Sequence, residues 1–230
     1  MYLLAIEQST PSGCLALLDD NALLAQEQWQ NERLRNQEMF RALPRLLRES
    51  GRTVADLDLF AVGLGPGSFA GVRTALAAAE GMAMVDRTPV AGVSSGAAIA
   101  WSLHEEGHAG PIAVVGDARR RRLWVAVFDC VDAAPGMRLP YALVRAEELT
   151  DTLRQAATVA TPEWSRIGDF VRRAAPASAV IVKRSCSPHA AVVGRLALRS
   201  YTPGSPPPMP VPIYLHPPVF VAPKYPARDH

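Results

Sequence analysis

MYLLAIEQSTPSGCLALLDDNALLAQEQW, residues 1–29, contains three short apolar runs with polar connectors between them. The runs span residues 2–7, 14–18 and 22–29, and the connectors contain Pro, Gly, Asp and Asn, which favour turns. Short apolar runs punctuated in this way predict β-strands joined by hairpins. We therefore expect the chain to begin with three antiparallel strands.

Helices and strands are predicted to alternate after these three strands. The expected order is helix, strand, helix, strand, helix, at residues 36–50, 59–64, 69–84, 89–92 and 94–107. Pro44 lies inside the first of these helices, but the apolar stripe continues past it. We therefore expect a kinked helix, or one that restarts with the proline in its first turn.

The second half of the chain repeats this order. The expected elements are strands at 112–115, 123–128 and 141–144, helices at 146–156 and 165–174, a strand at 179–182 and a helix at 190–199. Two successive β-β-β-α-β-α-β-α units predict an α/β protein with a mixed sheet in each half. We assign residues 1–110 to an N-terminal lobe and 111–200 to a C-terminal lobe. Residues 201–230 contain half of the chain's 20 prolines, which predicts an extended tail that packs back on the body.

Composition excludes several classes of protein. With 230 residues, 49% of them hydrophobic and 20% charged, the chain is neither disordered throughout nor fibrous. No apolar run approaches the roughly 20 residues of a membrane span, the first residues lack the basic segment of a secretory signal, and the three cysteines form no C-x-x-C pair. We expect a cytoplasmic protein with no membrane partner and no cysteine zinc site. A net charge of +2 provides no general attraction for nucleic acid, so any RNA contact would have to be local.

His104, Glu105 and His108 match the H-E-x-x-H pattern of zinc peptidases. That chemistry needs both histidines on one helical face, with the glutamate as general base. Gly107 and the Ala-Gly-Pro sequence that ends at Pro111 predict a helix stop, which would take His108 off that face. A zinc peptidase is one hypothesis, and a solvated helix end is the alternative.

The turn GLGPGS, residues 63–68, lies between a predicted strand and a predicted helix. Backbone amides at such a junction can bind phosphate, and the serine is a good N-cap. Candidate phosphate or nucleotide ligands are Ser9, Gly65, Gly67 and Ser68. The turn lacks the Gly-Lys-Ser/Thr of a Walker loop, and its proline removes one amide donor. The alternative is a tight turn that caps the helix and permits close packing.

Arginines stand out at two places. Arg73 lies near the start of a predicted helix, where a cation opposes the helix dipole, so we expect an ion pair with a carboxylate or contact with an anion. A second group forms a tight turn between two predicted strands and consists of Arg119, Arg120, Arg121 and Arg122. These four are candidate contacts for RNA phosphates, one each, and an ordinary solvated turn is the alternative.

Six short stretches occur in the order typical of the TsaB family, also called YeaZ. They are LAIEQST at 4–10, CLALLD at 14–19, GPGSFAGVR at 65–73, GVSS at 92–95, DAR at 117–119 and PIYL at 212–215. The third stretch matches G-P-G-S-F-x-G-[VL]-R, the most specific signature of the family. The chain therefore resembles TsaB proteins over nearly its whole length. Between residues 128 and 210, only the expected order of strands and helices supports the resemblance.

The resemblance implies a duplicated actin-like, ribonuclease-H-like fold of the ASKHA type, with two lobes that each hold a mixed β-sheet flanked by helices. It also implies a part in making N6-threonylcarbamoyladenosine in tRNAs that read ANN codons. In that system TsaB is a non-catalytic companion of the transferase TsaD, which it binds through helices of its N-terminal lobe, and the ATPase TsaE joins the pair. Contact with tRNA is made through the complex. The role requires no cofactor and leaves room for weak binding of ATP or ADP.

Two residues depart from patterns common in this fold and family. Glu7 replaces the aspartate that is common at the end of the first strand in this fold, where a carboxylate would organise a metal-bound phosphate, and Glu38 stands about where the family often has histidine. The early helices carry no histidine pair that could hold iron or zinc. We therefore expect no catalytic residues and no metal ligands in this chain.

Our hypothesis from the sequence is a scaffold subunit that docks TsaD, or a second copy of itself when TsaD is absent, through helices 36–50 and 69–84. Small residues in the second helix would allow another helix to approach closely, although core packing alone would also explain them. The expected interface residues are Met39, Leu43, Leu46, Phe69, Val72, Leu76 and Ala79. The alternatives are the zinc peptidase and a stand-alone nucleotide-binding protein that uses the glycine turn and residues 9–13.

Overall fold

The computed structural model describes residues 1–30, 37–131 and 134–217. In the first half of the chain, each predicted strand and helix is present within a few residues of its expected bounds. These elements are β1 (Tyr2–Glu7), β2 (Ser12–Asp19), β3 (Ala22–Gln30), α1 (Gln37–Glu49), a 3-10 turn (Val54–Asp56), β4 (Leu59–Gly63), α2 (Phe69–Asp86), β5 (Val90–Val93) and α3 (Ser95–Glu105). Pro44 lies inside α1 and does not end it, which agrees with the apolar stripe that continues past the proline.

The second half follows the predicted order with two differences. Its elements are β6 (Ile112–Arg119), β7 (Arg122–Val131), β8 (Ala134–Val144), a 3-10 turn (Ala146–Glu148), α4 (Leu149–Leu153), β9 (Thr158–Thr161), α5 (Trp164–Ala174), β10 (Val180–Ser185) and α6 (Ala190–Ser200). Strand β9 was not predicted, because its four residues are too few to show a period. The helix predicted over 146–156 is a 3-10 turn followed by one short α-helix.

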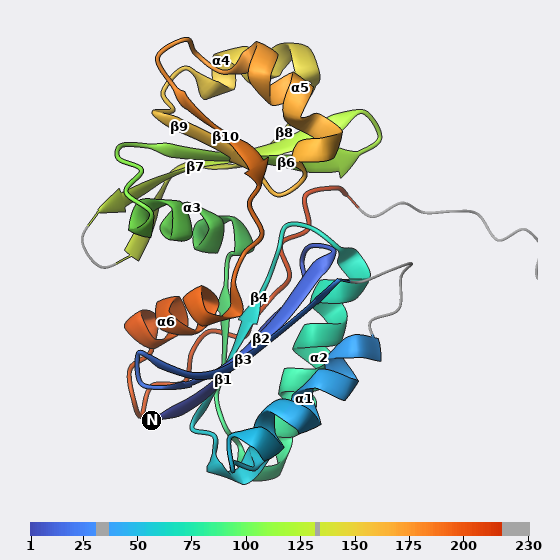
Figure 1. The fold of residues 1–230 in the computed structure, drawn as a ribbon, viewed down its shortest axis with the longest axis vertical. Helices are drawn as coiled ribbons and strands as arrows, with labels where there is room; N and C mark the ends of the chain where they lie inside the picture. The colour runs from blue at the N-terminus through green and yellow to red at the C-terminus, as the bar shows by residue number, and fades with distance from the viewer. Residues whose placement is uncertain (31–36, 132–133, 218–230) are drawn as a thin grey trace, which may run out of the picture.

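Two five-stranded sheets with the same strand order form the centre of the molecule (Figure 1). The first has the order β3-β2-β1-β4-β5, and the second, taken from its β8 edge, has the order β8-β7-β6-β9-β10. In each sheet the first three strands are antiparallel neighbours and the last two run parallel to the central strand. The predicted duplicated α/β fold with mixed sheets is confirmed.

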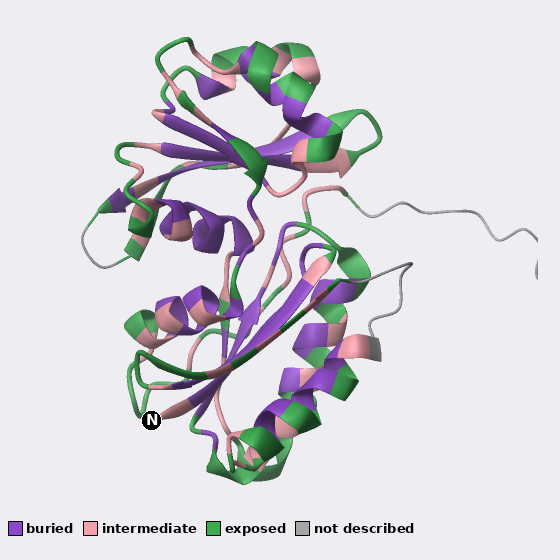
Figure 2. Ribbon diagram, in the orientation of Figure 1, coloured by how far each residue is buried: buried purple, intermediate pink, exposed green. Residues whose placement is uncertain are grey.

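Helices cover both faces of both sheets (Figure 1). The outer face of the first sheet is covered by α1 and α2, and the outer face of the second is covered by α4 and α5. Between the sheets lie α6, which packs on the first sheet, and α3, which packs on the second, and these two helices contact each other. Residues of both lobes form one buried apolar cluster there, seen as the purple centre of Figure 2. The outer face of α1 and α2 is therefore turned away from the second lobe.

The segment that follows α6 contacts both lobes. The Ile213 amide donates to the Leu64 carbonyl oxygen at 2.9 Å, and the His216 Nε2 lies 2.6 Å from the Ala118 carbonyl oxygen. Residues 218–230, the rest of the predicted tail, lie outside the described residues. The lobe boundaries at residues 110 and 200 stay predictions. Among the described residues, no helix combines the length and the apolar character of a membrane span.

Candidate functional site

Most side chains that the sequence assigned to an interface lie in the chain's own core. Only Phe69, with an exposed fraction of 58%, is open to solvent. The other six are buried. Met39, Leu43, Leu46, Leu76 and Ala79 belong to the apolar cluster on the first sheet, and Val72 is buried near the start of α2. Buried side chains leave little surface for a partner, because apolar residues at helical spacing mark the side of a helix that packs on its own sheet. A contact surface on these helices has to use their outward sides.

The outward side of α2 is apolar as well. The 18 residues of this helix include only three charged side chains, those of Arg73, Glu80 and Asp86. Exposed residues on it include Ala77, Gly81, Met84 and Val85, and the last two have exposed fractions of 79% and 78%. A helix with so few charged residues on its exposed side is normally covered there as well. The absence of charge along residues 74–79 and 81–85 was the signal in the sequence for this face.

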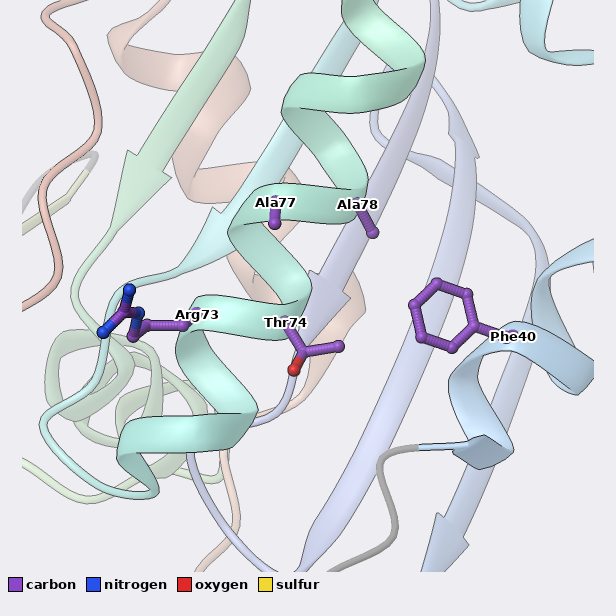
Figure 3. Close-up of a pocket in the computed structure, with 5 residues that line it drawn as sticks. All are labelled: Phe40, Arg73, Thr74, Ala77 and Ala78. Atoms are coloured by element: carbon purple, nitrogen blue, oxygen red, sulfur yellow. The ribbon is translucent and has the colours of Figure 1, made fainter.

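A shallow apolar groove runs between α1 and α2. Phe40 of α1, which is 55% exposed, points toward Thr74, Ala77 and Ala78 of α2 (Figure 3). The residues that line the groove are Phe40, Leu43, Val54, Ala77, Ala78, Gly81, Met82 and Val85. Because Ala77, Ala78 and Gly81 present only small side chains on the α2 side, a helix from another molecule can approach closely there. We call this groove and the outward side of α2 the docking face.

One end of the docking face is a stack of three side chains. The Arg73 guanidinium lies 5.0 Å from the centre of the Phe69 ring, and the Phe69 ring lies 5.2 Å from that of Tyr214. The expected ion pair of Arg73 is not formed with any carboxylate of the described residues. A cation over an aromatic face is stabilised by the ring quadrupole. This cation–π contact takes the place of the ion pair that was predicted for Arg73.

The glycine turn is closed by the residues that follow β1. The Ser68 amide donates to the Ser9 carbonyl oxygen at 2.7 Å, and the Gly65 amide donates to the Ser95 Oγ at 3.0 Å. A Cβ atom on Gly67 would lie 2.0 Å from the Ser9 carbonyl oxygen, so only glycine allows this approach. Two amides of the turn thus have partners inside the protein. Phosphate binding by the four candidate residues stays a prediction.

Glu7 is buried behind this turn. Its Oε2 accepts a hydrogen bond from the Ser95 hydroxyl at 2.7 Å, and its Oε1 accepts one from the Ser9 amide at 2.5 Å. Burial raises the pKa of Glu7 above the ordinary value, and the bonds from Ser9 and Ser95 act in the opposite direction. A Cβ atom on Gly63 would lie 1.8 Å from Oε2. The carboxyl group therefore ties β1 and β4 to the start of α3 and is not open to a ligand.

The H-E-x-x-H residues do not share a helical face. Helix α3 ends at Glu105, and Gly107 has a φ of 95°, so the predicted helix stop is confirmed and His108 lies beyond the helix. The Glu105 carboxylate accepts a hydrogen bond from Trp101 at 2.9 Å, and the His104 ring packs on the Trp101 ring. Among the described residues, no group of three or more His, Cys, Asp or Glu side chains is placed to hold a metal ion. The three residues therefore lack the geometry of a zinc peptidase.

The four arginines of the predicted turn form the tip of the β6-β7 hairpin, and all four are exposed. The structure thus brings the candidate RNA contacts together, as their neighbouring positions require. They belong to the second lobe, whereas the docking face belongs to the first.

Comparisons with known proteins agree with the resemblance. The family model TsaD, described as tRNA N6-adenosine threonylcarbamoyltransferase, matches residues 30–148, just over half of the chain. An Escherichia coli K12 protein, "tRNA threonylcarbamoyladenosine biosynthesis protein TsaB", is 30% identical over 128 residues, which are 56% of this chain and 55% of that protein. The chain thus spans about half the length of this relative. An uncharacterized Mycobacterium tuberculosis protein is 29% identical over 166 residues, which are 71% of this chain and 74% of that one.

Solved structures extend the similarity over nearly the whole chain. YeaZ from Pseudomonas aeruginosa matches with a TM-score of 0.77 and 26% identity, over 93% of this chain and 99% of that one. The ethanolamine utilization protein EutJ from Carboxydothermus hydrogenoformans, at 11% identity, shares the fold with a TM-score of 0.50 over 86% of this chain and 90% of that one. The sequence signatures, the duplicated sheets and these matches agree, and the chain belongs to the TsaB (YeaZ) family.

Proposed function

We propose that this chain is a non-catalytic scaffold subunit in the synthesis of N6-threonylcarbamoyladenosine in tRNA, and that it works in the cytoplasm by binding the transferase TsaD. The name of its E. coli relative and the description of the matching family model support this pathway. The ATPase TsaE joins the pair, and tRNA is reached through the complex. The scaffold needs no cofactor, binds ATP or ADP weakly at most, and pairs with a second copy of itself when TsaD is absent.

The observation that carries this proposal is the docking face. A catalytic pocket needs a few convergent polar groups, whereas this groove is lined by apolar and small side chains. Such a surface fits an apolar helix of a partner protein. A stable pair needs roughly 800 Å² buried on each partner, so we expect the contact to extend beyond the groove over the outward sides of both helices.

Substitution of Gly81 tests the docking face without disturbing the fold. No atom lies within 4 Å of the position that a Cβ on Gly81 would take, and arginine favours a helix more than glycine does. Gly81→Arg should therefore leave the thermal stability unchanged or slightly raised, while its charged side chain enters the groove. We expect the affinity for TsaD to fall at least about a hundredfold, since a desolvated charge without a partner costs several kcal/mol.

The matched control is Ser165→Arg, which makes the same change of charge at an exposed position of α5 on the other lobe. Its affinity for TsaD should equal that of the wild type. Reconstituted tRNA modification with TsaD and TsaE should drop to the level without this chain for Gly81→Arg and remain normal for Ser165→Arg. Unchanged TsaD binding by Gly81→Arg would show that the docking face is wrongly placed. Full modification without the chain would show that the proposed function is wrong.

A further inference from the structure

The tip of the β6-β7 hairpin has arginine at positions where the backbone conformation favours other residues. Arg119, Arg120 and Arg121 have φ angles of 65°, 51° and 58°, in the left-handed region that residues with a Cβ rarely adopt. Two-residue hairpin turns with positive φ at both positions are usually Asn-Gly. Strained residues of this kind are found at functional sites more often than elsewhere. The fold itself does not favour arginine at these three positions.

The base of the hairpin is fixed from two sides. The half-buried Asp117 carboxylate accepts a hydrogen bond from the Arg119 amide at 2.7 Å and forms an ion pair with Arg166 of α5. On the other side, the Ala118 carbonyl oxygen contacts the His216 ring. The tip is therefore held in place before any ligand arrives, which lowers the entropy cost of binding.

The tip carries positive charge that the protein does not neutralise. Arg119 pairs with Asp117 at 3.3 Å, and Arg122 lies 4.0 Å from Glu148. Within residues 1–30, 37–131 and 134–217, neither Arg120 nor Arg121 has a carboxylate within ion-pair distance. Exposed guanidinium groups without a partner bind phosphate well, because their planar donors match its oxygens in pairs.

We propose that this arginine tip binds the phosphate backbone of RNA. Every exposed side chain between Asp117 and Leu123 that projects from the turn is an arginine, so the tip offers no apolar anchor for the centre of a protein interface. A phosphate backbone needs only positive charge and hydrogen-bond donors. The inference rests on the proposed function, in which the polyanion is tRNA.

The tip and the docking face are joined by the C-terminal segment. Tyr214 contacts Phe69 at the end of the docking face, and His216, two residues later, contacts Ala118 at the base of the hairpin. An RNA held at the tip therefore lies nearest to the end of the docking face that Phe69 and Tyr214 form. This arrangement lets the scaffold add contacts to an RNA that its partner modifies.

The test is the double substitution Arg120→Asn with Arg121→Gly, assayed in the complex of the full chain with TsaD. Fluorescence anisotropy with a labelled, unmodified tRNA transcript should show affinity weakened about tenfold, and the slope of log affinity against log salt should become shallower by about one for each lost phosphate contact. The thermal midpoint should stay the same or rise, because Asn-Gly relaxes the turn. A merely structural role for the arginines would lower it.

The control is Arg172→Gln with Arg173→Gln, which removes two charges from the exposed side of α5 and should leave tRNA binding unchanged. Unchanged binding by the tip variant, or an equal loss in the control, would overturn the inference. The inference would also be overturned if the wild type bound polyglutamate, and the tip variant lost that binding but kept the tRNA affinity of the wild type. If modification requires the chain but the tip variant binds tRNA normally, only this inference fails. If modification does not require the chain, the proposed function fails.

Discussion

Helices α2 and α5 occupy equivalent places in the two lobes, yet their outward sides differ. Along the chain, α2 follows β4 and precedes β5, and α5 follows β9 and precedes β10. Each of the two helices covers the outer face of its sheet. The outward side of α5 carries Arg166, Asp169, Arg172 and Arg173 beside Phe170, whereas that of α2 carries Ala77, Gly81, Met84 and Val85 beside Arg73 and Glu80. The fold requires only the inward side to be apolar. The second apolar side of α2 is therefore not needed for folding, and it is where a function of the first lobe should be sought.

The largest effect should separate the two sides of α2. Ala79 is fully buried against the first sheet, and Ala77, two residues earlier, is exposed. We expect Ala79→Asp to lower the free energy of unfolding by about 3 kcal/mol or more, because it buries a carboxylate without a partner. Ala77→Asp should cost less than about 1 kcal/mol, mostly through helix propensity. Urea denaturation measures both, and equal losses would mean that the two sides are not distinct.

An intermediate effect should separate the two lobes. Phe40 on α1 and Phe170 on α5 are both exposed, at 55% and 44%. If the docking face binds TsaD, Phe40→Ser should weaken the affinity about tenfold or more, equivalent to at least about 1.4 kcal/mol, because aromatic side chains in grooves dominate binding. Phe170→Ser should leave it unchanged. Isothermal titration with TsaD measures both, and equal effects would remove the distinction between the lobes.

The smallest effect concerns the ends of the two central strands. Near the end of β6, Asp117 pairs with Arg166, whereas Glu7 at the end of β1 has no cation beside it among the described residues. Burial raises the pKa of Glu7, so the unfolded chain loses this proton at lower pH than the folded chain. The contribution of Glu7 to stability should therefore fall as the pH rises from 4.5, the ordinary value, to the pKa of the folded state.

Glu7→Gln keeps the shape of the protonated carboxyl group and should remove this dependence on pH. Its stability should match that of the wild type at about pH 4 and exceed it at about pH 8. Unfolding by urea across this range provides the measurement. A wild type whose stability relative to the variant does not change with pH would contradict the raised pKa.

Local patterns predicted most of the fold. The turn residues between the opening strands, the apolar stripe through Pro44 and the caps of α2 and α3 are all local signals, and the structure agrees with them. Strand β9 was not predicted because it is short and buried on both faces. Its sequence is too short to be identified by length and shows no alternation of apolar and polar residues. The repeated order of elements nevertheless required a strand at that place.

The site was less predictable, because it depends on contacts between distant residues. Apolar spacing indicated that α1 and α2 were important but could not separate the side that packs on the sheet from the side that faces solvent. The Glu7 carboxyl group accepts a hydrogen bond from Ser95, which lies 88 residues away in the chain. The contact of Arg73 with the Phe69 ring could have been predicted, because the two residues are one helical turn apart. We expected an ion pair or an anion contact for Arg73 instead.

Helix α3 follows the strands of the first sheet in the chain but packs on the second sheet, and α6 follows the strands of the second sheet but packs on the first. This exchange affects when the first sheet can fold during synthesis. The inner face of the first sheet is covered by α6, which ends at Ser200 and follows every strand of both sheets in the chain. A nascent chain that has emerged only as far as β5 therefore has its outer helices but exposes the apolar inner face. Since a domain folds as a unit, the first sheet cannot complete its core on the ribosome until the residues up to Ser200 have been translated.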